Sequence, residues 1–240
     1  MEEEYFQRTE LLLGAEAIRA LAEARVLLVG VGGVGSAAVE MLVRAGVGGI
    51  VLIDNDTVSD SNRNRQLPAL TSTIGRPKCE VVGQRLLDIN PALRLHTVCD
   101  YVTEDNIASV LGPLTLSYVV DAIDTLSPKI ALIQYCLSHG LPLVSSMGSG
   151  AKLDATAVRI ADISRTRECP LAHQLRKRLH RLGIFSGFKA VYSEEKPRRD
   201  SITLEESRNK KSQVGTISYL PVAFGCACAQ AVITGLLPED

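Results

Sequence analysis

The chain has 240 residues, of which 46% are hydrophobic, enough for one sizeable core, and its formal net charge is -1 at pH 7. This overall balance predicts neither nucleic-acid binding nor membrane binding. The charge is unevenly distributed, because residues 165–211 contain thirteen Lys or Arg and six Asp or Glu, a local balance of +7 that leaves -8 on the rest. We therefore expect a basic lobe on an acidic body.

The cysteines and the first residues bear on the compartment. The six cysteines lie mostly in apolar stretches, and the start MEEEYFQRTE lacks the basic and apolar parts of an export signal. We expect free thiols and a cytoplasmic protein. The apolar stretch from Ile217 to Leu237 is long enough to span a bilayer, but Pro221 and Gly225 interrupt it. We expect a buried C-terminal helix there and no membrane span.

Predicted helices and strands alternate through the first 150 residues. Apolar residues at helical spacing predict a helix over residues 11–22, before the strand RVLLVG, whose continuous apolar run suits burial on both faces. The elements that follow are a helix over 33–45, a strand over 49–54, a helix over 78–89, a strand over 93–98, a helix over 104–111, a strand over 117–121, another helix and the strand LPLVSS. This order predicts an α/β fold, a Rossmann-type doubly wound parallel sheet whose ligand crevice lies beyond the carboxyl ends of its strands.

The pattern changes after Thr156. We expect a strand at AVRIADI, a basic helix from Pro170 to Leu182 and a short strand near residues 189–192, which together form a C-terminal extension. The segment 193–214 is charged and poor in apolar residues, so we expect a mobile basic loop.

A glycine-rich motif lies between the first predicted strand and the next helix. Gly30, Gly32, Gly33 and Gly35 satisfy GxGxxG, a position where backbone amides and the helix dipole can hold a phosphate. Asp54 ends the next strand, nineteen residues past Gly35, where it can accept hydrogen bonds from a ribose. The motif indicates an adenine nucleotide, without separating NAD from ATP.

The sequence after Asp54 favours ATP. DNDTVSDSNRNRQ is charged and rich in amides, and a triphosphate needs cations to neutralise its oxygens. Together with GRPK ending at Lys78 and DAID at 121–124, it resembles the adenylation domain shared by ubiquitin-activating enzymes and the bacterial activators of molybdopterin-synthase and thiamine sulfur carriers. The resemblance implies an ATP-dependent carboxylate-adenylating enzyme.

The resemblance also implies roles for individual residues. Arg65 would stabilise charge on the α-phosphate, Lys78 would hold the phosphates, Asp124 would bind Mg²⁺, and Arg8 would enter the site of a dimer partner. The implied nucleotide-binding positions are Gly30, Gly32, Gly33, Gly35, Asp54, Asp56, Asn62, Asn64, Arg65, Gln66, Lys78, Asp121, Asp124 and Thr125. Plainer interpretations stay open, among them a solvated loop arginine, a turn cap, a helix cap and a surface arginine.

One branch of the superfamily matches more of the chain. Sulfur-carrier activators typically hold zinc with two CxxC pairs, and this chain contains no CxxC. The stretches RTELLLG, YVVDAIDTLSPK, SSMGSGAKLD, CPLAHQLRKRL and GTISYLPVAFG resemble the tRNA threonylcarbamoyladenosine dehydratases. In that branch ATP adenylates the threonylcarbamoyl carboxylate, and the amide of the substrate closes a ring as AMP leaves. The resemblance implies a homodimer that acts on tRNA, with a cysteine desulfurase or sulfur carrier as a further partner.

We therefore expect an ATP-binding adenylation half over residues 1–154 and an acceptor-site and dimer-contact half over 155–240. Arg176, Lys177, Arg178 and Arg181 are the candidates for tRNA binding, and a solvated helix face is the alternative. Cys169, before a proline that opens a helix, is either a reactive thiol or an ordinary exposed cysteine. Two rival functions stay open, namely activation of the C-terminal glycine of a ubiquitin-like sulfur carrier and a non-catalytic nucleotide-sensing module.

Overall fold

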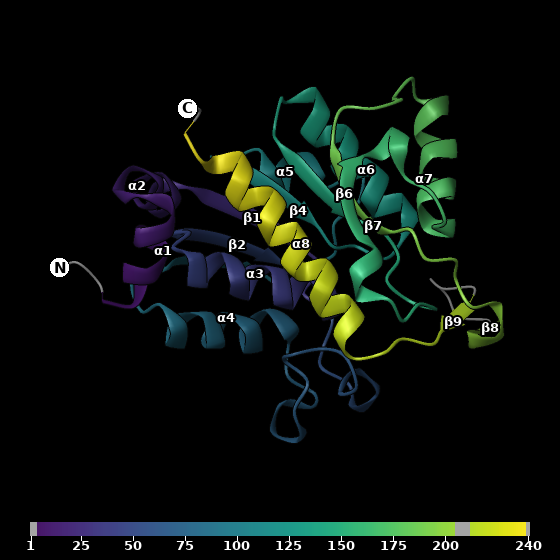
Figure 1. Ribbon diagram of the computed structural model, residues 1–240, viewed down its shortest axis with the longest axis horizontal. Coiled ribbons are helices and arrows are strands. Elements are labelled where there is room, and N and C mark those ends of the chain that lie inside the picture. The colour runs from purple at the N-terminus through teal and green to yellow at the C-terminus, as the bar shows by residue number, and fades with distance from the viewer. Residues whose placement is uncertain (1–3, 205–211, 239–240) are drawn as a thin grey trace.

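A seven-stranded sheet forms the centre of the molecule (Figure 1). The computed structural model describes residues 4–204 and 212–238. The strand order is β3-β2-β1-β4-β5-β7-β6, and all pairs are parallel except β6 with β7. The strands are β1 (Arg25–Val29), β2 (Gly49–Ile53), β3 (Arg94–Val98), β4 (Tyr118–Asp121), β5 (Leu143–Ser146), β6 (Val158–Asp162) and β7 (Lys189–Ser193). The predicted Rossmann-type α/β fold is confirmed, with an antiparallel edge strand added.

Helices cover both faces of the sheet, because successive strand residues point to opposite sides. Val26 and Leu28 of β1 face the core formed with α3, α4 and α8, whereas Leu27 and Val29 face the core formed with α5, α6 and α7. The helices are α1 (Gln7–Leu13), α2 (Ala15–Glu23), α3 (Gly33–Ala45), α4 (Lys78–Ile89), α5 (Ile107–Leu111), α6 (Leu126–Ser138), α7 (Pro170–Arg181) and α8 (Tyr219–Leu236).

The N-terminal helix differs from the prediction. The apolar spacing predicted one helix over residues 11–22, but the structure has two, α1 and α2, separated at Gly14. Gly14 has φ +84° and ψ 161°, a conformation open to glycine and strained for other residues, so the helix ends there.

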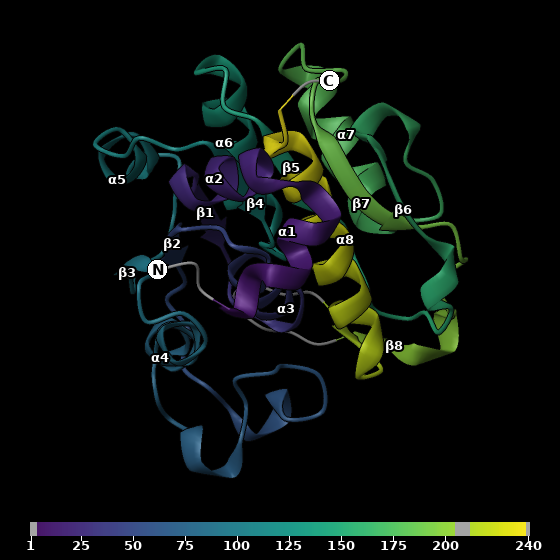
Figure 2. The same ribbon diagram turned by 60° about the vertical axis from the view of Figure 1, so that its left-hand side comes forward.

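Helix α8 is the one described helix that is long and apolar enough to cross a membrane. It lies across α3 in both views (Figure 1 and Figure 2). Its buried residues include Leu220, Phe224 and Cys228 in the core shared with α3. A Cβ at Gly225 would lie 2.6 Å from the Val34 oxygen, so a glycine is needed for this close approach. Packing against α3 accounts for much of the apolar character of α8.

The charged segment 193–214 contains structure where a loop was predicted. After β7, a short 3₁₀ turn (Arg199–Ser201) leads into β8 (Ile202–Leu204), which pairs antiparallel with β9 (Ser212–Val214). Residues 205–211 lie outside the described residues, so mobility of the segment stays a prediction.

Candidate nucleotide and acceptor site

Three parallel strands end together at one edge of the sheet. Strand β1 lies between β2 and β4, with Val29 in register with both Ile53 and Asp121. The glycine-rich turn therefore leaves the sheet beside Asp54 on one side and beside the 122–125 turn on the other. This is the point where the strand order reverses, which is where doubly wound sheets bind ligands.

The glycines of the turn have two different roles. Gly30 has φ +92°, and a Cβ there would lie 2.8 Å from the Ala122 oxygen. Cβ atoms at Gly33 and Gly35 would lie 2.9 Å from the Arg65 oxygen and 1.9 Å from the Gly30 oxygen. Gly32, the N-cap of α3, leaves an ordinary 3.7 Å separation to Gln66 Nε2. Three glycines thus permit close backbone packing, and Gly32 keeps the start of α3 uncrowded.

Asp54 fixes the turn through backbone amides. Its Oδ2 accepts a hydrogen bond from Val31 N at 2.6 Å, and its Oδ1 accepts one from Asp56 N at 2.7 Å. Burial raises the pKa of Asp54 from its ordinary value, although these amides and the Lys78 charge oppose the shift. Each oxygen has a second lone pair with which it can accept from a ligand hydroxyl.

Lys78 supplies a largely buried cation at the same edge. It is the first residue of α4, its side chain is 6% exposed, and its Nζ lies 2.8 Å from Asp56 Oδ2. A backbone bridge between Thr57 and Pro77 brings the two segments together. The predicted residues Asp54, Asp56 and Lys78 therefore form one connected group.

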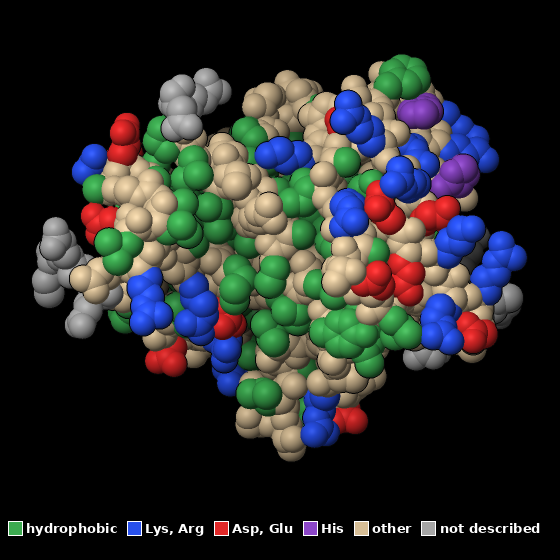
Figure 3. All heavy atoms as spheres, in the orientation of Figure 1, with side chains coloured by type: hydrophobic (Ala, Val, Ile, Leu, Met, Phe, Trp, Pro, Cys, Tyr) green, Lys and Arg blue, Asp and Glu red, His purple; other side chains and the backbone are tan. Residues whose placement is uncertain are grey.

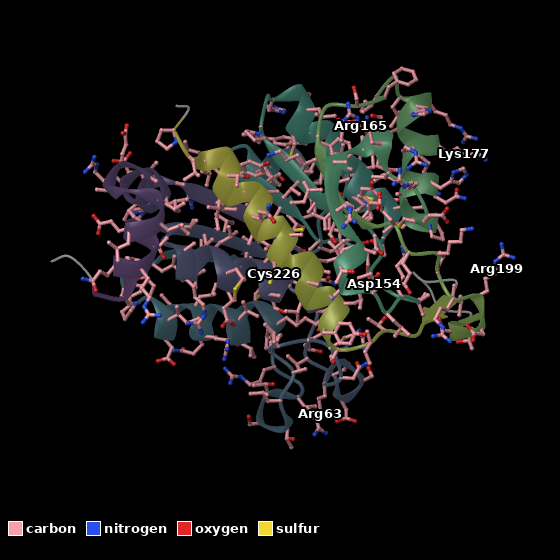
Figure 4. All side chains as sticks on the ribbon, viewed as in Figure 1. Arg63, Asp154, Arg165, Lys177, Arg199 and Cys226 are labelled. Atoms are coloured by element: carbon pink, nitrogen blue, oxygen red, sulfur yellow. The ribbon has the colours of Figure 1, made fainter. Side chains whose placement is uncertain are left out.

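The NRNRQ segment folds as a tight loop with an inner and an outer side. Buried Asn62 accepts from Ser59 N through Oδ1, and its backbone oxygen accepts from the amides of Arg65 and Gln66. Among the described residues, Gln66 Oε1 is buried without a hydrogen-bond donor, as an acceptor facing a bound polar molecule would be. Arg63 points outward and pairs with Asp60 (Figure 4).

Arg65 is held by its own loop. Its Nη1 donates to the Ser61 oxygen at 2.9 Å and to Asn64 Oδ1 at 2.7 Å. Asn64 Nδ2 donates in turn to the Thr216 oxygen at 2.9 Å, which ties the loop to the segment after β9. A groove of about 400 Å³ opens between these segments, lined by Ser61, Asn64, Arg65, Asp200, Ser201, Thr203, Val214, Gly215 and Thr216.

Asp121 is in the interior and not at the open edge. It has no exposed surface, its Oδ2 accepts from Lys129 Nζ at 2.7 Å and from Ser145 Oγ at 2.6 Å, and its Oδ1 accepts from Ile123 N. This geometry gives Asp121 a positioning role for the turn to Asp124. Lys129 and Ser145 were not predicted as partners of Asp121. The lone lysine in the largely apolar stretch LSPKIALIQYCLS was a signal for a buried cation.

Asp124 and Thr125 follow β4 at the site edge. Asp124 is exposed, and Thr125 is the N-cap of α6. Within the described residues, no group of three or more His, Cys, Asp or Glu is placed to hold a metal ion. Mg²⁺ is commonly bound by one or two carboxylates together with substrate phosphates, so a single carboxylate here is compatible with that ion.

Comparison with known proteins shows the family of the chain. The model of the ThiF family matches residues 6–239. The chain belongs to the ThiF family. It is 38% identical to the tRNA threonylcarbamoyladenosine dehydratase of Bacillus subtilis over 98% of this chain and 95% of that protein. It is 45% identical to the Escherichia coli dehydratase over 72% of this chain and 65% of that protein.

A solved structure agrees with the ThiF family assignment. The crystal structure of the Escherichia coli dehydratase in complex with ATP superposes with a TM-score of 0.89 at 35% identity, covering 97% of this chain and 93% of that one. The predicted resemblance to the ubiquitin-activating superfamily, and to its dehydratase branch, is confirmed.

Arg8 lies far from the glycine turn of its own chain. The neighbouring Phe6 packs beside Gly46, where a Cβ would be 3.5 Å from its ring. Gly46 follows the C-terminal end of α3, whereas the glycine turn is at the other end, and a 13-residue helix is about 20 Å long. Arg8 therefore does not belong to the site of its own ThiF-family chain.

The basic helix α7 presents most of its cations to solvent. Ala172, Leu175 and Leu179 are buried on one face, which leaves Lys177, Arg178 and Arg181 exposed on the other. Lys and Arg side chains gather over α7, together with His (Figure 3). Arg176 differs from the other three candidates, because its Nη1 donates to the backbone oxygen and the Oγ1 of Thr166.

Cys169 is a helix cap. It is 6% exposed, and its Sγ accepts from Ala172 N at 3.5 Å, so the predicted alternative of an exposed cysteine is wrong. Nearby, the ammonium of buried Lys152 donates to the oxygens of Glu168 and Ser193, and burial lowers the pKa of Lys152. The pair of hydrogen bonds holds the start of α7 against the end of β7.

Proposed function

We propose that the chain is an ATP-dependent enzyme that adenylates the carboxylate of tRNA threonylcarbamoyladenosine and then cyclises it with loss of water overall. The observation that carries the proposal is the grouping of Arg65 and Lys78 around the glycine turn, beside a polar groove, in a chain that matches dehydratases almost end to end. A carboxylate-adenylating site needs such preorganised cations at the phosphates.

The nucleotide would lie along the edge formed by β1, β2 and β4. The amides at the start of α3 and Lys78 would hold phosphates, and Asp54 would accept from the ribose hydroxyls. Buried Gln66 Oε1 supports a bound polar group near Gly32. Mg²⁺, held by Asp124 and the phosphates, would supply charge neutralisation.

The chemistry divides into two steps. A carboxylate oxygen of the substrate attacks the α-phosphorus and pyrophosphate leaves, with Arg65 stabilising the charge on the phosphoryl oxygens. The amide nitrogen of the substrate then attacks the activated carbonyl, loses its proton and displaces AMP. The attacking group is part of the substrate, so proximity removes the need for a covalent enzyme nucleophile. Burial of Cys169 as a helix cap supports this route.

The basic lobe is the proposed tRNA surface. Lys177, Arg178 and Arg181 point outward from α7, and Arg165 and Arg199 lie on the same side of the molecule (Figure 4). Clustered cations bind RNA through phosphate contacts that release counterions. In this proposal residues 1–154 supply the adenylation half, and residues 155–240 supply the acceptor site and much of the dimer contact.

The proposal includes a homodimer. Leu11 and Leu12 of α1 are 83% and 81% exposed beside Arg8, and apolar side chains gather along α8 on the face drawn in Figure 3. A second copy covering these surfaces would bury them and could bring Arg8 to the partner's site. We place the protein in the cytoplasm with α8 as a core helix, and a cysteine desulfurase or sulfur carrier remains a proposed partner.

Pyrophosphate release with three alternative acceptors tests the function. The protein is assayed with ATP and Mg²⁺, and with tRNA carrying threonylcarbamoyladenosine, with the same tRNA lacking the modification, or with a ubiquitin-like carrier protein. Release with the modified tRNA alone, and a mass loss of one water in the nucleoside, are the expected results. Release with the carrier alone would favour sulfur-carrier activation, and no release with any acceptor would favour a nucleotide-sensing module.

A further inference from the structure

The two walls of the groove beside Arg65 have opposite hydrogen-bonding character. On one wall, both hydrogen bonds of Arg65 within the described residues come from Nη1, so Nε and Nη2 are available to an anion. The guanidinium presents these donors in a fixed plane, which suits a carboxylate or phosphate.

The opposite wall presents three side chains that can accept hydrogen bonds, Asp200, Ser201 and Thr216. Ser201 Oγ donates its proton to the Arg198 oxygen at 2.7 Å, and Thr216 Oγ1 donates to the Val214 oxygen at 3.1 Å. A hydroxyl has one proton and two lone pairs, so both side chains can now only accept. Asp200 adds a carboxylate to the same wall. This wall is therefore suited to a ligand that carries N–H and O–H donors.

Backbone contacts hold the acceptor wall in place. Gly215 N donates to the Ser201 oxygen, Ala151 N donates to the Gly215 oxygen, and Arg198 N donates to the Ala151 oxygen, at 2.7 to 2.8 Å. A Cβ at Gly150 would lie 2.6 Å from Val214 Cγ1, so this approach needs a glycine. Asn64 Nδ2 then spans the two walls through its bond to the Thr216 oxygen. The groove is thus preorganised on both sides.

We propose that this groove selects a hydroxylated amino-acyl group, with its carboxylate toward Arg65 and its amide N–H and hydroxyl toward Ser201 and Thr216. The inference rests on the proposed function and adds to it a specificity determinant, the acceptor wall. A groove of about 400 Å³ lies within the size range of small-molecule sites and suits a threonylcarbamoyl arm. A carrier tail ending in glycine has an amide N–H but no side-chain hydroxyl, so it would leave one of the two acceptors without a donor.

The exposure of the groove sets how strongly the enzyme should prefer a substrate with the hydroxyl over one without it. Sites that bind a substrate hydroxyl reject analogues that lack it, most strongly when the site is buried. This groove is open to solvent, so losing the hydroxyl should cost only the net free energy of one hydrogen bond. That free energy corresponds to a preference of roughly tenfold in kcat/KM.

The experiment compares two RNA substrates with one enzyme set. Anticodon stem-loops carrying either a threonylcarbamoyl or a glycylcarbamoyl adenosine are assayed for AMP formation with wild type, Ser201→Ala and Thr216→Val. Wild type is expected to prefer the threonyl RNA about tenfold, and at least one variant to lose most of that preference. ATP binding by calorimetry and binding of the unmodified stem-loop by anisotropy are expected to stay unchanged. Ser109→Ala is the matched control, since exposed Ser109 also donates to a backbone oxygen but lies on α5.

Equal activity of wild type on the two RNAs would overturn the selectivity while leaving the proposed function intact. A wild-type preference that both variants retain would overturn the assignment to this wall, again without touching the proposed function. Failure of wild type on both RNAs would remove the proposed function and this inference together.

Discussion

Lys129 Nζ lies 2.7 Å from Asp121 Oδ2, and neither side chain has any exposed surface. The same ammonium donates to the Ile123 oxygen, and Ile123 N donates to Asp121 Oδ1. The pair therefore shapes the turn that leads from β4 to Asp124. A buried ion pair in the core is connected in this way to the edge where the nucleotide is proposed to bind.

Breaking this pair is expected to destabilise the fold strongly. Lys129→Met leaves the Asp121 carboxylate buried without its counter-charge, a change that typically costs about 3–5 kcal/mol. The double variant Asp121→Asn with Lys129→Met should lose less than the sum of the single losses, because no buried charge remains. Urea denaturation measures these free energies. Asp60→Asn, which breaks the exposed Arg63–Asp60 pair, is the control and should change stability by about 1 kcal/mol or less.

Most helices and strands could be predicted from the sequence, but strand direction and contacts between distant side chains could not. Helices 33–45 and 78–89 were predicted with the observed bounds, because apolar periodicity and the flanking Gly and Pro are local signals. The antiparallel pairing of β6 with β7 was not predicted, since the direction of a short strand depends on its distant partner. The inward orientation of Asp121 and the hydrogen bonds from Arg176 to Thr166 were not predicted either, because each depends on a partner side chain or backbone group elsewhere in the chain. The glycine turn and Asp54 were placed at one edge because the βαβ unit fixes it, whereas Lys78, which opens the helix after that unit, was placed there only through the family resemblance.

Arg65→Ala is expected to lower AMP formation by roughly two orders of magnitude, the loss typical of a preorganised charge removed from a phosphoryl centre. Arg63→Ala is a matched control from the same loop, because Arg63 points outward and pairs only with exposed Asp60 among the described residues. It should retain near-wild-type turnover. Single-turnover AMP formation with both variants, each verified as folded by circular dichroism, is the measurement. Equal turnover of the two variants would exclude Arg65 from the mechanism.

Cys169→Ser is expected to retain most cyclisation activity. The Sγ acts as the cap of α7, and serine is a strongly preferred cap that can accept the same Ala172 amide. No acyl-thioester has to form if the amide of the substrate closes the ring. Product formation is followed by nucleoside mass spectrometry, with thermal unfolding as the check on folding. Near-total loss of activity in a stable variant would instead support a covalent thioester route.

Glu40 is expected to contribute to stability at neutral pH and to lose that contribution in acid. Burial opposes its charged form, but hydrogen bonds and charge from Arg85 and Arg44 outweigh that effect and hold the pKa of Glu40 below its ordinary value. Its contribution is complete above the unfolded pKa near 4.3 and disappears as the pH falls through the lower folded pKa. Glu40→Gln should therefore be less stable at pH 7, with a difference from wild type that narrows below about pH 4. Glu80→Gln on α4 is the control for charge removal, because Glu80 is exposed. If the difference in free energy of unfolding between Glu40→Gln and wild type did not narrow in acid, this account would be contradicted.

The α7 surface is expected to carry RNA affinity through phosphate contacts. Reversing Lys177, Arg178 and Arg181 to Glu should weaken binding of a labelled anticodon stem-loop while ATP binding stays unchanged, because all three side chains are exposed and their replacement disturbs no buried contact. Arg176 is left intact, since its bonds to Thr166 would confuse a binding effect with a folding effect. Log affinity falls linearly with log salt at a slope of about -0.9 per duplex phosphate contact, so the triple variant should also show a shallower slope. Fluorescence anisotropy across a salt series gives the affinity and the salt slope. Arg19→Glu on α2 is the control, and it tests whether reversing a cation outside the basic lobe weakens RNA binding less. Unchanged affinity and slope in the triple variant would leave α7 as a solvated basic face without a role in RNA binding.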